Sequence, residues 1–152
     1  KDIWLVVVNV FAASKQAGAV WKKAAVMLEE SGVSYKAMFT GGADNAIAIS
    51  RKASAMGYRR FMAVGGDGTV HDIINGIAGY SDDNSVKLSE FVLAVIPLGS
   101  GNDWVRTFGI SKNIRSAVRL LKEGRVARQD MVKVSLLNDG PVTIIVDSKL
   151  KF

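Results

Sequence analysis

The sequence predicts an α/β protein with a mostly parallel sheet, helices on both faces of the sheet and a C-terminal hairpin. Four short apolar runs alternate with stretches whose apolar residues recur at helical spacing, and this alternation is typical of parallel sheets. The first run, IWLVVV, is uninterrupted, as expected for a strand covered on both faces. The runs end in small or polar residues, near Asn9, Thr40, Gly65 and Pro97. Ligands of such sheets bind at the carboxyl ends of the strands, so we expect a binding site among these four loops.

The first two helices have recognisable ends. Apolar residues over positions 17–28 share one helical face, and Gly32 suits the position just after that helix. Asp44 or Asn45 is expected to cap the second helix, which we expect to stop at Gly57. The strands that precede these helices are expected at residues 3–8 and 34–40.

The second half of the chain continues the alternation and then changes it. We expect the third helix to end at Gly79, with a polar loop over residues 80–90. Asn113 is suited to cap a later helix that Gly124 closes. Two runs of β-forming residues flank the Asn-Asp-Gly sequence at residues 138–140, which is a hairpin signal. The other elements are expected at residues 61–64 and 91–97 (strands), from residue 103 (a short helix), and at 127–137 and 142–146 (the hairpin strands).

Composition and charge narrow the classes of partner. At 152 residues the chain is long enough for one domain with a packed core. It contains no cysteine, which excludes disulfides and thiolate metal sites and fits a reducing compartment. No apolar run approaches the roughly 20 residues of a membrane-spanning helix. The net charge of +6 favours anionic partners, namely a nucleotide, a nucleic acid or an acidic membrane surface.

The stretch GGDGT, at residues 65–69, joins the third strand to the third helix and is suited to hold a phosphate. Its glycines let backbone N–H groups approach an anion, and the helix end adds further donors. Thr69 is expected to be the N-cap, with Asp72 completing a capping box. Asp67 repels a phosphate directly, so its place here is explained by a Mg²⁺ ion between the two. The alternative is an ordinary tight turn in which Asp67 is only a turn residue.

A second glycine turn, LGSGND, follows the fourth strand at residues 98–103. It offers backbone N–H groups and several polar side chains, although a plain polar helix cap explains the same residues equally well. Beside GGDGT at a neighbouring strand end, it is placed to help clamp one polyphosphate. The groups that it offers belong to Gly99, Ser100, Gly101, Asn102 and Asp103.

These two motifs resemble the diacylglycerol kinase catalytic-domain family, the lipid kinases that include sphingosine and ceramide kinases. VGGDGTVHDIINGI is similar to the family's nucleotide-binding segment, and IPLGSGNDWVRTFGI to its second motif. The resemblance covers residues 3–134, and the bacterial members are particularly similar. It implies a three-layer α/β/α, Rossmann-like N-terminal domain of the kind found in NAD kinases and 6-phosphofructokinases. It also implies that ATP lies in the cleft between this domain and a C-terminal β-rich domain.

The resemblance also implies roles for single residues. Asp67 would lie near Mg²⁺ and the phosphates, which makes it both the metal candidate and the catalytic candidate in this chain. Asp103, Trp104 and Arg106 occupy matched positions of the second motif, and Asp130 occupies the usual acidic position of the strand that leads into the second domain. Together the motifs and the resemblance give the nucleotide-binding candidates Thr40, Gly65, Gly66, Asp67, Gly68, Thr69, Val70, His71, Ser100, Gly101, Asn102 and Asp103.

Two departures from the family pattern shape the expected function. The first strand leads into NVFAASK, at residues 9–15, without the family's proline and glycines, which weakens phosphate binding by this loop. The family's general base and structural metal carboxylates lie in a C-terminal domain that this chain does not reach. We therefore expect residues 1–134 to be the nucleotide-binding domain of an ATP-dependent lipid kinase, with residues 135–152 beginning the second domain. The protein is expected in the cytoplasm, peripheral at the inner membrane face, and nearly inactive as this fragment.

Several alternatives stay open. An NAD kinase-type enzyme shares the GGDGT turn, although such enzymes usually carry Asn-Glu after it and this chain has His71-Asp72. A non-catalytic nucleotide or lipid sensor with the same fold is consistent with the altered first loop. His71 either faces a phosphate or, more commonly for a residue so placed, is a solvated helix residue. Basic residues over positions 112–128 form either a patch for anionic lipid headgroups or, as is commoner, a solvated charged face.

Overall fold

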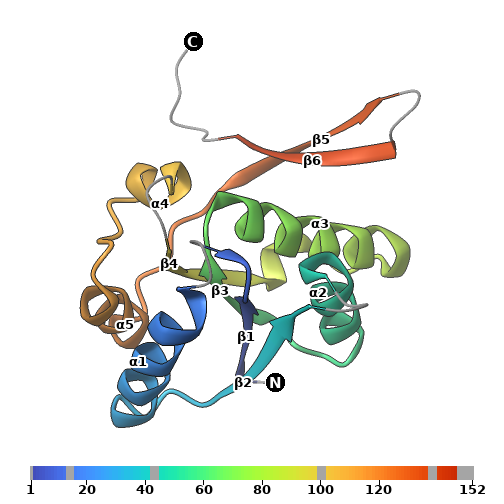
Figure 1. Ribbon diagram of the computed structural model, residues 1–152. Coiled ribbons are helices and arrows are strands. Elements are labelled where there is room, and N and C mark those ends of the chain that lie inside the picture. The colour runs from blue at the N-terminus through green and yellow to red at the C-terminus, as the bar shows by residue number, and fades with distance from the viewer. Residues whose placement is uncertain (1, 13–15, 42–44, 99–101, 137–139, 147–152) are drawn as a thin grey trace.

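The structure is a computed structural model that describes residues 2–12, 16–41, 45–98, 102–136 and 140–146 (Figure 1). Strands and helices alternate through the first two thirds of the chain, and a hairpin follows, as the sequence predicts. The elements are β1 (Trp4–Asn9), α1 (Ala17–Glu30), β2 (Tyr35–Thr40), α2 (Ala46–Ala55), β3 (Arg60–Gly65), α3 (Asp67–Asn84), the 3-10 helix η2 (Leu88–Glu90), β4 (Val92–Pro97), α4 (Asp103–Thr107), α5 (Ile114–Glu123), β5 (Asp130–Leu136) and β6 (Gly140–Val146).

The central sheet is parallel, with the strand order β2-β1-β3-β4. The register aligns the last residues of neighbouring strands, so that Asn9 lies opposite Thr40 and Gly65 lies opposite Pro97. From β1 the chain crosses to β2 on one side, and β3 then pairs with the other side of β1. The order therefore reverses between β1 and β3, and in open α/β sheets ligands bind outside the carboxyl ends at such a point.

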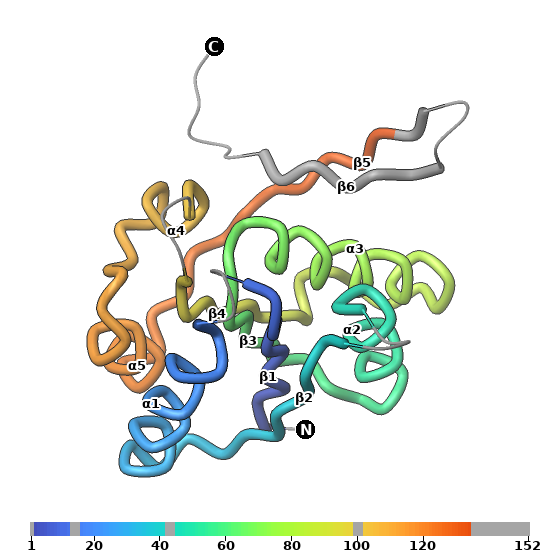
Figure 2. Tube along the Cα trace, in the orientation of Figure 1, coloured from blue at the N-terminus to red at the C-terminus, as the bar shows by residue number. Residues whose placement is uncertain are grey.

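Helices cover both faces of this sheet, with α2 and α3 on one face and α1 and α5 on the other (Figures 1 and 2). Successive residues of β1 point to opposite layers. Leu5 and Val7 pack into the cluster beneath α2 and α3, whereas Val6 and Val8 pack beneath α1. All four side chains are almost fully buried, which explains why the strand is apolar without alternation. The three-layer α/β/α prediction is confirmed.

Two helix starts and one helix end follow the local sequence rules. The Asn45 side chain accepts a hydrogen bond from the Ala48 amide at 2.9 Å and caps α2. The Asn113 side chain accepts from the Arg115 amide at 2.9 Å and caps α5. Gly124 ends α5 in the left-handed region, with a φ of 66°, which glycine adopts without steric cost. These ends are predictable because each depends on residues within one turn of the helix.

The start of α3 differs from the prediction. The helix begins at Asp67 with Gly66 as its N-cap, so Thr69 lies inside the first turn and is buried. The predicted Thr69 cap and its capping box with Asp72 are therefore wrong. The Thr69 hydroxyl instead accepts a hydrogen bond from the Asn9 side chain of β1.

The end of α3 also lies beyond the predicted position. The helix continues through Gly79 to Asn84, so part of the predicted polar loop over residues 80–90 is helical. A Cβ atom on Gly76 would lie 2.4 Å from the Ile47 carbonyl oxygen of α2, and one on Gly79 would lie 3.1 Å from the Arg51 guanidinium. Gly76 and Gly79 therefore allow α2 to pack closely against α3, and neither of them ends the helix. Ser85 ends the helix in the left-handed region, with a φ of 54°.

The predicted hairpin is present as the antiparallel pair β5–β6, in which Asp130 lies opposite Val146 and Leu136 lies opposite Gly140. Its turn, at residues 137–139, lies outside the described residues. The first strand begins at Asp130, later than predicted. The Gln129 side chain, just before it, accepts a hydrogen bond from the Trp104 indole at 3.1 Å. Lys133 of β5 pairs with Asp82 of α3 at 2.5 Å, which ties the hairpin to that helix.

Candidate functional site

A chain of hydrogen bonds links the carboxyl ends of β2 and β1 to the first turn of α3, the helix that follows β3. The Thr40 hydroxyl donates to the Asn9 side-chain oxygen at 3.3 Å, and the Asn9 amide group donates to the Thr69 hydroxyl at 3.1 Å. The Phe11 backbone amide also donates to the Asn9 side-chain oxygen, at 3.0 Å. Thr40 and Thr69, which are far apart in sequence, are thereby brought to one edge of the sheet. Asn9 joins them at the point where the strand order reverses.

Asn9 is the residue of this network that the sequence prediction missed. It appears only as the residue that ends the first strand, and its amide is suited to two partners because it carries a donor and an acceptor. The signal that could have identified it is its place at the carboxyl end of a buried strand, level with Thr40 of β2. Polar residues at such ends are candidates for ligand contacts.

The glycines of the first turn serve different purposes. A Cβ atom on Gly65 would lie 2.3 Å from the Thr69 hydroxyl oxygen, so the packing of the turn against Thr69 requires glycine there. Outside the backbone of its own helix, no atom of the described residues lies within 4 Å of a Cβ placed on Gly68, which is exposed and in a helical conformation. The fold itself therefore does not require glycine at position 68. Glycine at this position leaves the backbone uncovered by a side chain.

Asp67 joins the two glycine turns. One of its carboxylate oxygens accepts a hydrogen bond from the Asp103 amide at 2.9 Å, and the other accepts from the Trp104 amide at 3.2 Å. These two amides begin α4, where N–H groups lack partners within the helix. A carboxylate is favourable at this position because it caps those donors and faces the positive end of the helix. The structure thus brings Asp67 and Asp103, both predicted site residues, into direct contact.

The residues at this edge meet part of the requirement for Mg²⁺. Among the described residues, no group of three or more His, Cys, Asp or Glu side chains could enclose a metal ion. Mg²⁺ with a nucleotide needs only one or two carboxylates, with phosphate oxygens and water completing its octahedron. The Asp67 oxygens each keep acceptor capacity after receiving one amide hydrogen, and the Asp103 side chain is 82% exposed. The site therefore fits an ion that arrives with phosphate and does not fit a metal held by protein alone.

The described part of the second turn is held by Asn102. This residue is buried, takes the left-handed region with a φ of 55°, and donates through its side-chain amide to the Leu98 carbonyl at 3.1 Å. Asparagine tolerates this conformation better than most residues. Its oxygen would lie 3.7 Å from a Cβ on Gly66, so the two turns are close neighbours. Ser100 and Gly101 lie outside the described residues.

The remaining predicted residues of α3 lie on different sides of the helix. The Val70 side chain is buried in the core, so any ligand contact by Val70 would use its backbone. The His71 side chain is 43% exposed and lies 3.8 Å from the Asp72 carboxylate. The Asn75 amide lies 3.2 Å from each ring nitrogen of His71. The described neighbours of His71 are thus other polar residues of its own helix.

The α4 residues beyond Asp103 hold that helix in place. Trp104 packs against Phe108 with ring centroids 4.8 Å apart, and its indole donates to Gln129. Arg106 pairs with the Asp103 carboxylate at 3.2 Å. The ion pair keeps a guanidinium group beside the carboxylate at the site edge.

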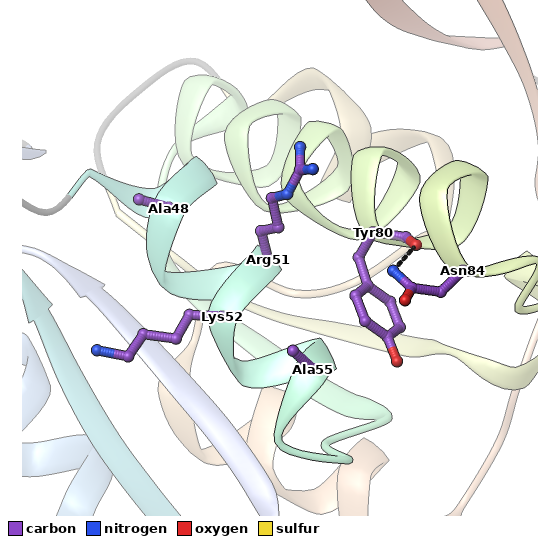
Figure 3. Close-up of a pocket in the computed structure, with 6 residues that line it drawn as sticks. All are labelled: Ala48, Arg51, Lys52, Ala55, Tyr80 and Asn84. Atoms are coloured by element: carbon purple, nitrogen blue, oxygen red, sulfur yellow. Dashed lines mark hydrogen bonds between the residues drawn. The ribbon is translucent and has the colours of Figure 1, made fainter.

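A cavity of about 450 Å³ lies elsewhere, between α2 and α3 (Figure 3). It is shallow, and Figure 3 shows Lys52 extending away from Tyr80 and Asn84. Tyr80 lies thirteen residues after Asp67 on α3, which is about 20 Å along a helix. None of the predicted site residues that the structure describes contributes to this cavity, so it is separate from the described part of the strand-end site. It is lined by Ala48, Arg51, Lys52, Ala55, Tyr80 and Asn84.

Across the parts of the chain that the structure describes, no helix combines the length and the apolar character needed to cross a membrane.

Comparison with known proteins gives consistent matches. A family model described as "Diacylglycerol kinase catalytic domain" matches residues 3–134. A diacylglycerol kinase from Staphylococcus saprophyticus is 31% identical over 110 residues, which are 72% of this chain and 34% of that protein. Sphingosine kinase B from Dictyostelium discoideum is 26% identical over 77% of this chain and 15% of its own length. The crystal structure of a diacylglycerol kinase from Bacillus anthracis superposes with a TM-score of 0.68 over 92% of this chain and 45% of that one; at 24% identity it shows the fold.

Proposed function

We propose that this chain binds the nucleotide of a lipid kinase, on the premise that it belongs to the diacylglycerol kinase catalytic domain family. The chain spans 34% of the length of its Staphylococcus saprophyticus relative, so the activity of the whole protein is part of the proposal. That activity is transfer of the ATP γ-phosphate to a lipid hydroxyl, as the names of the relatives suggest. The observation that carries the proposal is the contact of Asp67 with α4, which ties two glycine turns together at the edge where the strand order reverses.

The first turn of α3 is the proposed binding site for the phosphates. The first N–H groups of a helix have no partners within it and attract anions, and α3 is 18 residues long. Gly68 leaves its backbone open on the exposed side of that turn. Thr40 and Thr69, held by Asn9, would supply hydroxyl groups at the neighbouring strand ends. The full proposed set is Thr40, the residues from Gly65 to His71, Ser100, Gly101, Asn102 and Asp103.

Asp67 has two proposed roles. It holds the start of α4 beside the first turn, which positions the second turn for the same phosphate chain. Together with Asp103 it would also hold Mg²⁺, which when bound neutralises charge on the transferring phosphoryl group. Phosphoryl transfer depends mainly on alignment and charge stabilisation, so a residue that fixes both turns contributes directly to alignment.

The lipid acceptor and the general base that activates it are assigned to a part of the protein outside the nucleotide-binding domain. We assign nucleotide binding to residues 1–134 and the start of a second domain to residues 135–152. A general base that takes the proton from the lipid hydroxyl is expected outside this chain. A lipid acceptor also implies peripheral contact with an anionic membrane surface. Which lipid is phosphorylated would depend on the acceptor pocket of the second domain.

Isothermal titration calorimetry of the intact protein with Mg·ATP tests this function. We expect saturable binding that Asp67→Ala weakens by about 10- to 100-fold. The reason is that the substitution removes hydrogen bonds to a charged group, each of which contributes about 1.5–3 kcal/mol. Asp83→Ala is the matched control. It removes the same charge from the same helix, but at its far end, where Asp83 pairs with Arg51.

Two results would contradict the proposal. Absence of Mg·ATP binding in the intact protein would exclude the nucleotide role. Equal losses in Asp67→Ala and Asp83→Ala would exclude the strand-end site as its location. Binding of Mg·ATP without phosphorylation of any lipid would favour the sensor alternative, for which the altered loop at residues 9–15 is the supporting feature.

A further inference from the structure

The positive charge of the chain is concentrated in one segment, residues 111–129. This segment contains six basic residues and one acid, Glu123, whereas the rest of the chain contains fourteen basic residues and thirteen acids. Almost all of the net charge of +6 therefore comes from one eighth of the sequence. We refer to these six side chains as the basic surface: Lys112, Arg115, Arg119, Lys122, Arg125 and Arg128.

The basic surface is built on one side of α5. Arg115, Arg119 and Lys122 fall within an arc of about 60°, at 100° per residue, and all are exposed. Ala117 and Val118 are buried on the other side and fix the helix against the core. The orientation of the stripe toward solvent is thus set by packing of the opposite side.

Two arginines of the basic surface share a single carboxylate. Glu123 lies 3.7 Å from Arg119 and 3.2 Å from Arg125, so one carboxylate is shared by two guanidinium groups. The two arginine side chains remain 72% and 79% exposed. Such exposed pairs are weak and exchange readily for other anions. A surface that presents this much charge is well suited to an anionic partner.

Part of the basic surface lines a shallow cavity, and an exposed apolar side chain lies nearby in sequence. Arg115, Arg119 and Lys122 also line a shallow cavity of about 210 Å³ between α1 and α5, with Glu30 as the acidic residue on its wall. Val126 follows α5, lies between two of the arginines in sequence and is 72% exposed. Cations that surround an exposed apolar side chain are typical of proteins that rest on anionic bilayers.

The same segment leads to the candidate site. After Arg128 the next residue, Gln129, accepts a hydrogen bond from Trp104 of α4, and α4 is the helix that Asp67 holds. Figure 1 shows the chain running from the end of α5 past β4 toward β5. The segment that carries the basic surface therefore leads from α5 to α4, the helix that Asp67 contacts.

We propose that the basic surface docks on a bilayer that contains anionic phospholipids, with Val126 entering the headgroup region. This inference rests on the proposed function, because the acceptor of a lipid kinase lies in a bilayer. Single-stranded nucleic acid is the less suitable partner, since its bases stack on aromatic side chains and residues 111–129 contain none.

Vesicle flotation with the intact protein, without nucleotide, tests the docking. The vesicles are phosphatidylcholine alone and equimolar phosphatidylcholine and phosphatidylglycerol. We expect binding only to the anionic vesicles, weakened by about 100-fold in R115A/R119A/K122A, because each basic residue near the surface contributes about 1 kcal/mol. The matched control K36A/K52A/K87A removes three exposed lysines from β2, α2 and the segment after α3 and should lose less than about tenfold. Val126→Gln should bind the anionic vesicles more weakly, because it removes the apolar side chain without changing the net charge.

Several outcomes would overturn the docking. Absence of binding to anionic vesicles excludes it, and so does an equal loss in the two triple variants, since net charge alone would then explain the binding. Tighter binding to single-stranded DNA than to anionic vesicles, with the same variant dependence, would assign the surface to nucleic acid. Calorimetry with Mg·ATP is run on the same variants. Normal nucleotide binding with no vesicle binding refutes the docking alone, whereas vesicle binding with no nucleotide binding refutes the proposed function alone.

Discussion

At its N-terminal end α3 lies beside the strand ends, with Gly65 just before the helix and Gly68 in its first turn. In its C-terminal half the same helix lies against α2 through Gly76 and Gly79. At the first end, polar side chains from two strands and from the first turn of α3 itself are joined by hydrogen bonds. At the second, a close approach of two backbones is flanked by the exposed ion pair of Arg51 with Asp83. The two ends of α3 therefore differ: the glycines of the C-terminal half are required by packing against α2, whereas Gly68 at the N-terminal end is left available to a ligand.

The largest expected effect is that of Gly76→Ala on stability. The new methyl group would lie 2.4 Å from the Ile47 carbonyl and 2.0 Å from the Ser50 hydroxyl oxygen, so α2 must move away. Overpacking of this kind costs about 3 kcal/mol, which exceeds the gain of about 1 kcal/mol from replacing helical glycine by alanine. Urea denaturation measures the difference. Gly18→Ala in α1 is the control, because no atom of another described element lies within 4 Å of a methyl group there. This control should raise the free energy of unfolding. If Gly76→Ala left the free energy of unfolding unchanged, α2 and α3 would be less tightly packed than described.

The next largest effect is expected for Asn9→Ala at the opposite end. The substitution removes the partners of the Thr40 and Thr69 hydroxyls, and unpaired buried polar groups cost about 1–3 kcal/mol. Both the free energy of unfolding and the affinity for Mg·ATP should fall. Asn84→Ala, at the exposed end of α3, should change stability by less than about 0.5 kcal/mol. If Asn9→Ala behaves like Asn84→Ala in both measurements, the network contributes neither stability nor binding.

A smaller effect is expected for Asp67→Asn. Asparagine keeps one acceptor oxygen but turns an NH₂ group toward one of the two amides of α4, so one hydrogen bond is lost, at a cost of about 1–2 kcal/mol. The loss should be local, and amide hydrogen exchange of Asp103 and Trp104 should speed up while that of β1 does not. Asp83→Asn serves as the control. Unchanged protection of those two amides would show that α4 does not depend on Asp67.

The comparison also shows which features a sequence can reveal. The strands and the Asn45 and Asn113 caps follow from residues within one turn or one apolar run, and they were predicted. The contacts of Asn9 with Thr69 and of Asp67 with α4 join residues 60 and 36 positions apart, so no local rule contains them. Gly79 misled the prediction because glycine that ends a helix and glycine that admits a neighbouring helix look alike in sequence. The site motif itself was visible because its glycines, acid and threonine are contiguous.

Gly68→Ala gives the smallest expected effect on stability and the sharpest test of the comparison. A methyl group at this position meets no atom of another described element within 4 Å. Alanine favours the helical conformation already present, so the free energy of unfolding should change by less than about 1 kcal/mol. If the open backbone of Gly68 receives a phosphate, the same methyl group occupies the space of the ligand, and the affinity for Mg·ATP should fall by at least about tenfold, or 1.4 kcal/mol. Calorimetry and urea denaturation on one preparation separate the two quantities. A lower affinity for Mg·ATP with an unchanged free energy of unfolding would identify Gly68 as a ligand contact, because the methyl group contacts no other described element. Unchanged binding would place the phosphates away from the backbone of Gly68 and would leave the Thr40–Asn9–Thr69 network as a remaining candidate contact at this edge.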